Sequence, residues 1–162
     1  MSLTIKPELR RLSLTNPLHW IAVGFGSGLS PKAPGTMGTI AAIPFFLLLQ
    51  PLSIPAYLGV LLVAFVIGVW ACQSATDTIG QEDHGGLVWD EFVGLWITCI
   101  ALPQGFGWIL LAFVLFRFFD ILKPWPINWV EKRYSGGFGV MMDDVIAGVI
   151  ALAVVQLIRL FV

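Results

Sequence analysis

Five of the ten acidic side chains lie in three short stretches that are far apart in the chain. The stretches are VWDEFVG (88–94), FRFFDILK (116–123) and GGFGVMMDD (136–144), and their acids are Asp90, Glu91, Asp120, Asp143 and Asp144. If they meet in a low-dielectric setting, these carboxylates cannot all be ionised without a counter-ion. Mg²⁺ held by carboxylate oxygens would supply that charge, so we predict that all five are metal ligands. The alternative is that they are solvated helix ends paired with Arg117, Lys123 and Arg133.

Two basic side chains accompany the second of these stretches. Arg117, Asp120 and Lys123 are spaced by three, which places them on one side of a helix end. Arginine and lysine suit phosphate oxygens, so we predict that Arg117 and Lys123 bind a phosphate group of the substrate. The alternative for Lys123 is a role as a membrane anchor beside Trp125 and Trp129.

A glycine-rich segment, GFGSGLSPKAPGT (24–36), offers a second set of phosphate-binding groups. Its backbone N–H groups, with Ser27, Lys32 and Thr36, have the chemistry of a phosphate-binding loop. The segment matches neither GxxxxGK[ST] nor GxGxxG, so a loop without a ligand is an equal alternative. His84, in DHGG, is a candidate for proton transfer, although a single loop histidine is more often incidental.

The composition shows what kind of protein must position these groups. Hydrophobic residues make up 57% of the 162 residues, charged residues 12%, and the net charge is −1. Soluble domains carry about 25% charged residues, and the mean hydropathy here is +0.87. We therefore predict an integral membrane protein with one domain over 1–162, in which 1–15 is an N-terminal arm without an assigned role. A net charge near zero provides no basic field for nucleic acid.

Apolar blocks fall at 37–50, 56–73, 87–103, 106–122 and 145–162. They predict an all-α, polytopic membrane bundle of about five helices, some of them tilted because they are shorter than a perpendicular span. The segment 17–36 is apolar but rich in glycine and proline, so we expect it to be interfacial or re-entrant. With the N-terminus inside, 18 of the 19 charged side chains lie on the cytoplasmic side and only Arg159 lies outside.

Counting along the helices predicts that the acids share one depth. The blocks at 87–103 and 106–122 form a hairpin around Gln104. Asp90 and Asp120 both lie about 20 Å from that turn at 1.5 Å per residue. Asp143 and Asp144, at the expected start of the last helix, fall within a turn or two of the same level. The start of a helix also favours anions.

Two non-enzymatic functions compete with a catalytic one. Acids inside a membrane also mark the ion paths of transporters, but such paths place charges near the bilayer midplane on several helices. A structural assembly protein would use Ala147 and Ala151 as a small-residue packing face and needs no acidic cluster.

Four blocks of the chain resemble the phosphatidylglycerophosphatase A family of bacteria. These are GFGSGLSPKAPGTMGT (24–39), VWDEFVG (88–94), FRFFDILKPWPI (116–127) and GGFGVMMDDVIAGVIA (136–151). The resemblance implies a Mg²⁺-dependent phosphatase of the bacterial inner membrane with its active site at the cytoplasmic face. It would hydrolyse the phosphomonoester of phosphatidylglycerophosphate within the bilayer, without an obligate protein partner. Asp90, Glu91, Asp120 and Asp144, with His84, would then be the catalytic residues.

Overall fold

The computed structural model describes residues 6–13, 15–81 and 84–162, and these residues form helices and loops without any strand. The elements follow in the order η1 (Pro7–Arg11), α1 (Pro17–Ala22), η2 (Gly24–Leu29), α2 (Pro34–Leu49), α3 (Ile54–Ile79), α4 (Trp89–Thr98), α5 (Phe106–Leu122), α6 (Ile127–Arg133) and α7 (Gly136–Arg159), where η marks a 3-10 helix. The prediction of an all-α protein is confirmed for these residues.

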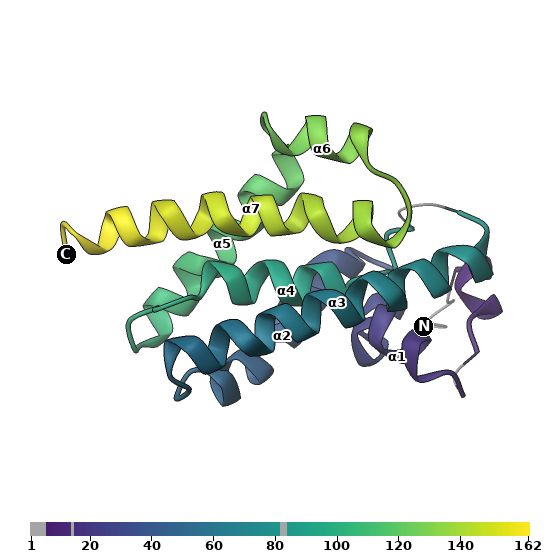
Figure 1. Ribbon diagram of the computed structural model, residues 1–162, viewed down its shortest axis with the longest axis horizontal. Helices are drawn as coiled ribbons and strands as arrows, with labels where there is room; N and C mark the ends of the chain where they lie inside the picture. Colours follow the sequence, from purple (N-terminus) through teal and green to yellow (C-terminus); the bar gives the residue numbers. More distant parts are fainter. Residues whose placement is uncertain (1–5, 14, 82–83) are drawn as a thin grey trace.

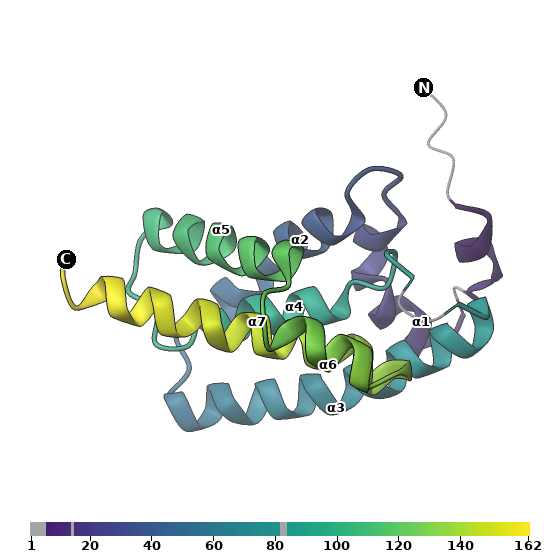
Figure 2. The same cartoon turned by 90° about the horizontal axis from the view of Figure 1, so that it is seen from above.

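Helix α4 is the centre of the bundle. All ten of its residues are buried, and it packs against α2, α3, α5 and α7. Figure 2 shows α2 and α5 on one side of α4, and α3 and α7 on the other. Helices α3, α4 and α7 run along the long axis of the molecule, with the C-terminus at one end and α1 toward the other (Figure 1).

Short sequence signals set the helix ends that matter for the site. Helix α2 starts at Pro34, after Ala33 in the left-handed conformation (φ 46°), and a proline favours the first position of a helix. Helix α3 ends at Ile79 and is followed by Gly80, also left-handed (φ 77°), whose N–H donates to the carbonyl oxygen of Thr76 at 2.8 Å. Helix α5 ends at Leu122 and is followed by Lys123, which is also left-handed (φ 42°).

Glycines allow α4 and α7 to approach closely. A Cβ on Gly148 would lie 2.5 Å from the carbonyl oxygen of Gly94, and a Cβ on Gly94 would lie 3.0 Å from the carbonyl oxygen of Asp144. This contact brings the acids of α7 beside the first turn of α4, where Asp90 and Glu91 lie.

The surface of the bundle is strongly apolar. Leu48, Leu62 and Trp70 expose 74%, 65% and 64% of their surface, as expected of side chains that face lipid. By length and composition, α3 and α7 are the helices in the described chain that could cross a membrane. Together they indicate a membrane-associated protein. Helices α2, α4 and α5, with 16, 10 and 17 residues, are shorter than the roughly 20 residues of a perpendicular span.

Two expected boundaries need correction. Helix α7 begins at Gly136, so Asp143 and Asp144 lie about two turns inside the helix and not at its positive end. The apolar block 87–103 forms a helix only as far as Thr98, since the chain turns at Cys99. The segment 17–36 contains α1 and η2, more helical than an open loop. Its interfacial or re-entrant placement stays a prediction.

Candidate functional site

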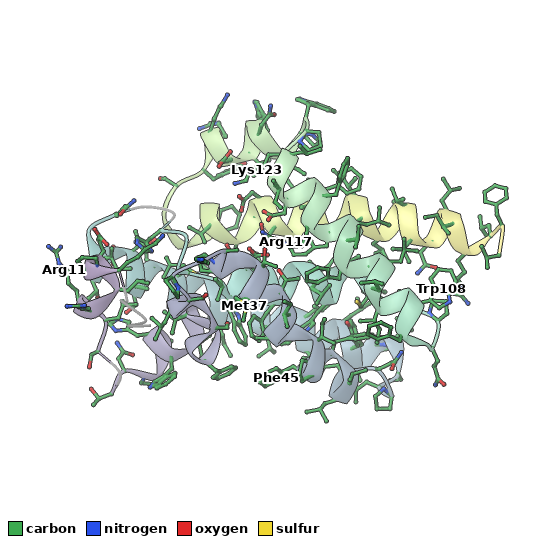
Figure 3. All side chains as sticks on the ribbon, turned by 180° about the vertical axis from the view of Figure 1, so that it is seen from behind. Arg11, Met37, Phe45, Trp108, Arg117 and Lys123 are labelled. Carbon is green, nitrogen blue, oxygen red and sulfur yellow. The ribbon has the colours of Figure 1, made fainter. Side chains whose placement is uncertain are left out.

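One pocket of about 390 Å³ collects the charged side chains of three helices. All five predicted carboxylates line it, together with Arg117, Lys123 and Thr36. Its walls are the first turns of α2 and α4, the last two turns of α5 and the third turn of α7, with Gly85 and Leu87 from the loop before α4. In Figure 3, Arg117 and Lys123 lie near the middle of the long axis, above α2, and the N-terminal elements extend beyond them. The fold therefore brings all five acids to the lining of one pocket.

Arg117 holds two of the acids through a single nitrogen. Its Nη1 donates to Glu91 Oε2 and to Asp120 Oδ2, the latter at 2.6 Å. Its Nε is buried and has no hydrogen-bond partner in the described chain. Leaving a buried donor unpaired is costly. The guanidinium as a whole lines the pocket, where the two carboxylates hold it in place.

Lys123 holds two further acids, of which Asp143 lines the pocket. Its Nζ donates to Asp143 Oδ2 and to Glu131 Oε1, both at 2.7 Å. Burial lowers the pKa of Lys123, but the carboxylates of Asp143 and Glu131 outweigh it and raise the pKa above its ordinary value. Lys123 therefore stays protonated throughout the physiological range.

Asp90 and Asp144 are the two pocket carboxylates that form no ion pair among the described residues. Both are buried, at 8% and 3% exposure. Asp90 Oδ1 accepts the backbone N–H of Glu91 at 2.9 Å, whereas Asp144 Oδ2 is buried without a partner in the described chain. The pocket thus has negative charge and oxygen lone pairs that its own cations leave unbalanced.

These donors fit a hard divalent cation in type and in charge. Carboxylate oxygens are the ligands that Mg²⁺ takes, and Asp144 presents one with no other partner in the described chain. The acids line the pocket without converging on one point. Within the described residues, no three His, Cys, Asp or Glu side chains are already arranged to hold a metal ion.

Three predicted site residues lie outside the pocket. Ser27 Oγ donates to the carbonyl oxygen of Gly24 within its own loop at 2.8 Å, and Lys32 is exposed. His84 is buried, and its Nδ1 accepts the backbone N–H of Gly86 at 3.1 Å. Ser27, Lys32 and His84 are absent from the pocket lining, so their predicted roles in phosphate binding and proton transfer find no support in this geometry.

Three other residues contribute to the site without having been predicted. Thr39 Oγ1 lies 2.8 Å from Glu91 Oε2, Gly35 leaves the space for the same carboxylate, and Glu131 shares Lys123 with Asp143. Gly35 and Thr39 are four residues apart, a spacing that predicts that they lie on the same face of a helix. Glu131 gave no comparable signal in the sequence.

Comparison with known proteins identifies the relatives of this chain. The sequence profile of phosphatidylglycerophosphatase A matches residues 20–159. The phosphatidylglycerophosphatase A of Escherichia coli (strain K12) is 48% identical over 149 residues, covering 91% of this chain and 87% of the relative. That of Haemophilus influenzae (strain ATCC 51907 / DSM 11121 / KW20 / Rd) is 46% identical over 159 residues, covering 97% of this chain and 98% of the relative.

A third relative carries a different name. A candidate phosphatidylinositol-3-phosphatase of Bacteroides thetaiotaomicron is 41% identical over 147 residues, covering 86% of this chain and 91% of the relative. No solved structure matches the chain. Since the profile and the first two relatives cover nearly all of it, the chain belongs to the phosphatidylglycerophosphatase A family.

Proposed function

We propose that this protein hydrolyses the phosphomonoester of phosphatidylglycerophosphate to phosphatidylglycerol and phosphate. The observation that carries the proposal is the pocket in which Arg117, with an unpartnered Nε, lies among five carboxylates. The names of the relatives from Escherichia coli and Haemophilus influenzae supply the substrate. In the reaction, water adds to phosphorus, the bond between phosphorus and the glycerol oxygen breaks, and that oxygen takes up a proton.

Arg117 and Lys123 bind the phosphoryl group in this proposal. The guanidinium of Arg117 presents an edge to a phosphate oxygen, while Glu91 and Asp120 hold it at Nη1. Arginine binds phosphate best through such a planar, fixed edge. Lys123 contributes a permanent positive charge to the pocket, beside Asp143.

We also propose that Asp90, Glu91, Asp120, Asp143 and Asp144 hold Mg²⁺, and that Asp90 and Asp144 are its first ligands because no ion pair in the described chain occupies them. When bound, the ion lowers the pKa of a water molecule and neutralises charge on the phosphoryl oxygens. A carboxylate of the same group accepts the proton that the attacking water releases.

The proposed placement is a bacterial inner membrane with the pocket at the cytoplasmic face. Helices α2, α3, α4, α5 and α7 are the membrane-embedded elements, and the segment 17–36 lies at the interface. The support is the charge distribution, since the two uncharged connections 51–55 and 103–105 lie on the side away from 18 of the 19 charges. A lipid headgroup reaches the pocket at that depth while its acyl chains stay in the bilayer.

The test is phosphate release by the purified, detergent-solubilised protein. We expect release from phosphatidylglycerophosphate with Mg²⁺, and none after chelation. Phosphatidylinositol 3-phosphate is the comparison substrate, because one relative is named for it. Faster release from that lipid would replace the proposed substrate, and the absence of release from either lipid with Mg²⁺ present would overturn the phosphatase proposal.

A further inference from the structure

Helix α2 contacts the ion pair that holds Arg117. Thr39 is fully buried, and its Oγ1 lies 2.8 Å from Glu91 Oε2 and 2.9 Å from the carbonyl oxygen of Gly35. A hydroxyl has one proton to donate, and a carboxylate is a stronger acceptor than a neutral carbonyl. Thr39 therefore donates to Glu91, on the same oxygen that accepts Nη1 of Arg117.

Gly35 lies one helical turn before Thr39 and provides the room for this carboxylate. A Cβ at position 35 would collide with Glu91 Oε1 and would lie 3.3 Å from both Nη1 and Nη2 of Arg117. Gly35 and Thr39 thus position the Glu91 carboxylate together: Gly35 leaves the space that it occupies, and Thr39 donates a hydrogen bond to it.

We propose that Thr39 and Gly35 are positioning residues that orient the phosphate-binding edge of Arg117 through Glu91. With Glu91 fixed by α2, Nη1 of Arg117 stays between Glu91 and Asp120, and the guanidinium keeps one orientation in the wall of the pocket. Without the Thr39 hydroxyl, the Glu91 carboxylate loses a fixed donor and can rotate together with the guanidinium. The inference rests on the proposed phosphatase function, because it assigns Arg117 to the phosphate.

The experiment compares Thr39→Val, which removes the hydroxyl at nearly constant volume, with Thr39→Ser, which keeps it. Thr98→Val is a matched control, since Thr98 is also fully buried and its Oγ1 lies 3.0 Å and 3.3 Å from the backbone carbonyl oxygens of Gly94 and Gly148. The readouts are kcat and KM for phosphatidylglycerophosphate, and the rise in thermal midpoint that inorganic phosphate produces.

We expect Thr39→Val to raise KM roughly tenfold, the effect of one lost hydrogen bond to a charged group, with a smaller change in kcat. In the same variant, inorganic phosphate should raise the thermal midpoint by less than it does in the parent protein. Thr39→Ser should stay within about twofold of the parent. Thr98→Val should lower the midpoint without phosphate and leave KM unchanged. If Thr39→Val fails to fold, Gly35→Ala carries the test, and its KM should also rise.

A double-mutant cycle with Arg117→Lys shows whether Thr39 acts through the guanidinium. Residues that act through one contact give non-additive effects, so Thr39→Val should change KM little once Arg117 is lysine. Additive effects, an unchanged KM in Thr39→Val, or a loss in Thr39→Ser as large as in Thr39→Val would each overturn the inference. A parent protein that binds inorganic phosphate but releases none from the lipid would contradict the proposed function instead, and the phosphate-induced shift would still test Thr39.

Discussion

Asp90 and Asp144 differ from the other acids of the pocket because neither forms an ion pair in the described chain. Glu91 and Asp120 share Arg117, and Asp143 shares Lys123 with Glu131. The cations thus divide the five carboxylates into three that are held in place and two that are open to a ligand. The sequence alone does not distinguish the acids that are held by ion pairs from those that are not.

The first prediction concerns these two acids. Mg²⁺ at about 100 times its Kd should stabilise the protein by about 2.7 kcal/mol, a rise of several degrees in the thermal midpoint. Asp90→Asn and Asp144→Asn keep the shape of the side chain but remove its charge. Each should lower phosphate release by about a hundredfold or more and reduce the Mg²⁺-induced shift. Melting curves and phosphate release with and without Mg²⁺ measure both effects.

The control for this prediction is Asp77→Asn. Asp77 is exposed and accepts a hydrogen bond from Gln73 Nε2 at 2.8 Å, away from the pocket. The Asp77→Asn substitution should change neither the activity nor the rise in thermal midpoint that Mg²⁺ produces. Inactive Asp90 and Asp144 variants with a full Mg²⁺ shift would show that these acids are not the ligands.

The second prediction separates Lys123 from the surface lysine Lys132. Lys123→Ala removes the partner of buried Asp143, so we expect lower turnover and a lower thermal midpoint, whereas Lys132→Ala should resemble the parent. Because the pKa of Lys123 is raised from its ordinary value of 10.5, the stabilisation by its charge is complete below that pH. It is lost only as the pH rises through the higher pKa of the folded state.

Thermal melting at two pH values tests this pH dependence of the stabilisation by Lys123. The destabilisation by Lys123→Ala should be the same at about pH 6 and about pH 9, since Lys123 is protonated at both. A destabilisation that disappears by about pH 9, or equal and mild losses in both lysine variants, would contradict a structural ion pair with Asp143.

At the scale of elements, the contact between α4 and α7 decides whether the pocket exists. Asp90 and Glu91 lie in the first turn of α4, and Asp143 and Asp144 lie on α7. The two helices meet through the backbone of Gly94 and Gly148. Any side chain at that crossing would move the carboxylates of α7 away from those of α4.

The third prediction tests this crossing with Gly148→Ala. The added methyl group would lie 2.5 Å from the Gly94 carbonyl oxygen and 3.2 Å from Ile97 Cβ. Overpacking of this kind costs about 1–3 kcal/mol, so the thermal midpoint should fall by several degrees and phosphate release should fall with it.

Gly107→Ala is the matched substitution in open space. A Cβ at Gly107 would meet nothing within 4 Å, and alanine suits a helix better than glycine. We expect an unchanged or slightly higher midpoint and unchanged activity. Equal losses in the two alanine variants would mean that the close crossing of α4 and α7 is unimportant.

At the scale of the whole molecule, the pocket lies partway along the long axis, with the N-terminal elements beyond it (Figure 3). The C-terminus lies at the far end of α7 (Figure 1). A bilayer around the apolar part between the pocket and the C-terminus would leave the N-terminal elements in the cytoplasm. That placement agrees with the proposed location of the site.

The fourth prediction is the orientation of the chain. With five membrane-embedded helices, a reporter fused after Val162 should be periplasmic, and one inserted at 81–85, after α3, should be cytoplasmic. Reporter enzymes that are active on only one side of the membrane measure this. Both reporters on the same side would contradict five spans and remove the argument for the depth of the pocket.

The helical class and the shared level of the acids follow from the amino-acid sequence alone. Apolar blocks of membrane length must be helical, because a helix satisfies every backbone hydrogen bond internally. A rise of 1.5 Å per residue then converts spacing into depth. Spacing along the chain predicts that Asp90, Glu91 and Asp120 lie near each other, and all three line one pocket, although α4 ends at Thr98 and does not continue to the turn. Spacing also places Asp143 and Asp144 at this level, although the helix start that it predicts for them is seven residues too late.

Which side chains meet within that level depends on the tertiary packing. Depth follows from counting, but the rotation of a helix about its axis follows from packing with its neighbours. For this reason spacing does not reveal the contact of Thr39 with Glu91, the sharing of Lys123 by Asp143 and Glu131, or the unpartnered oxygen of Asp144 in the described chain. The same packing leaves Ser27, Lys32 and His84 outside the pocket, although their residue types suit phosphate chemistry.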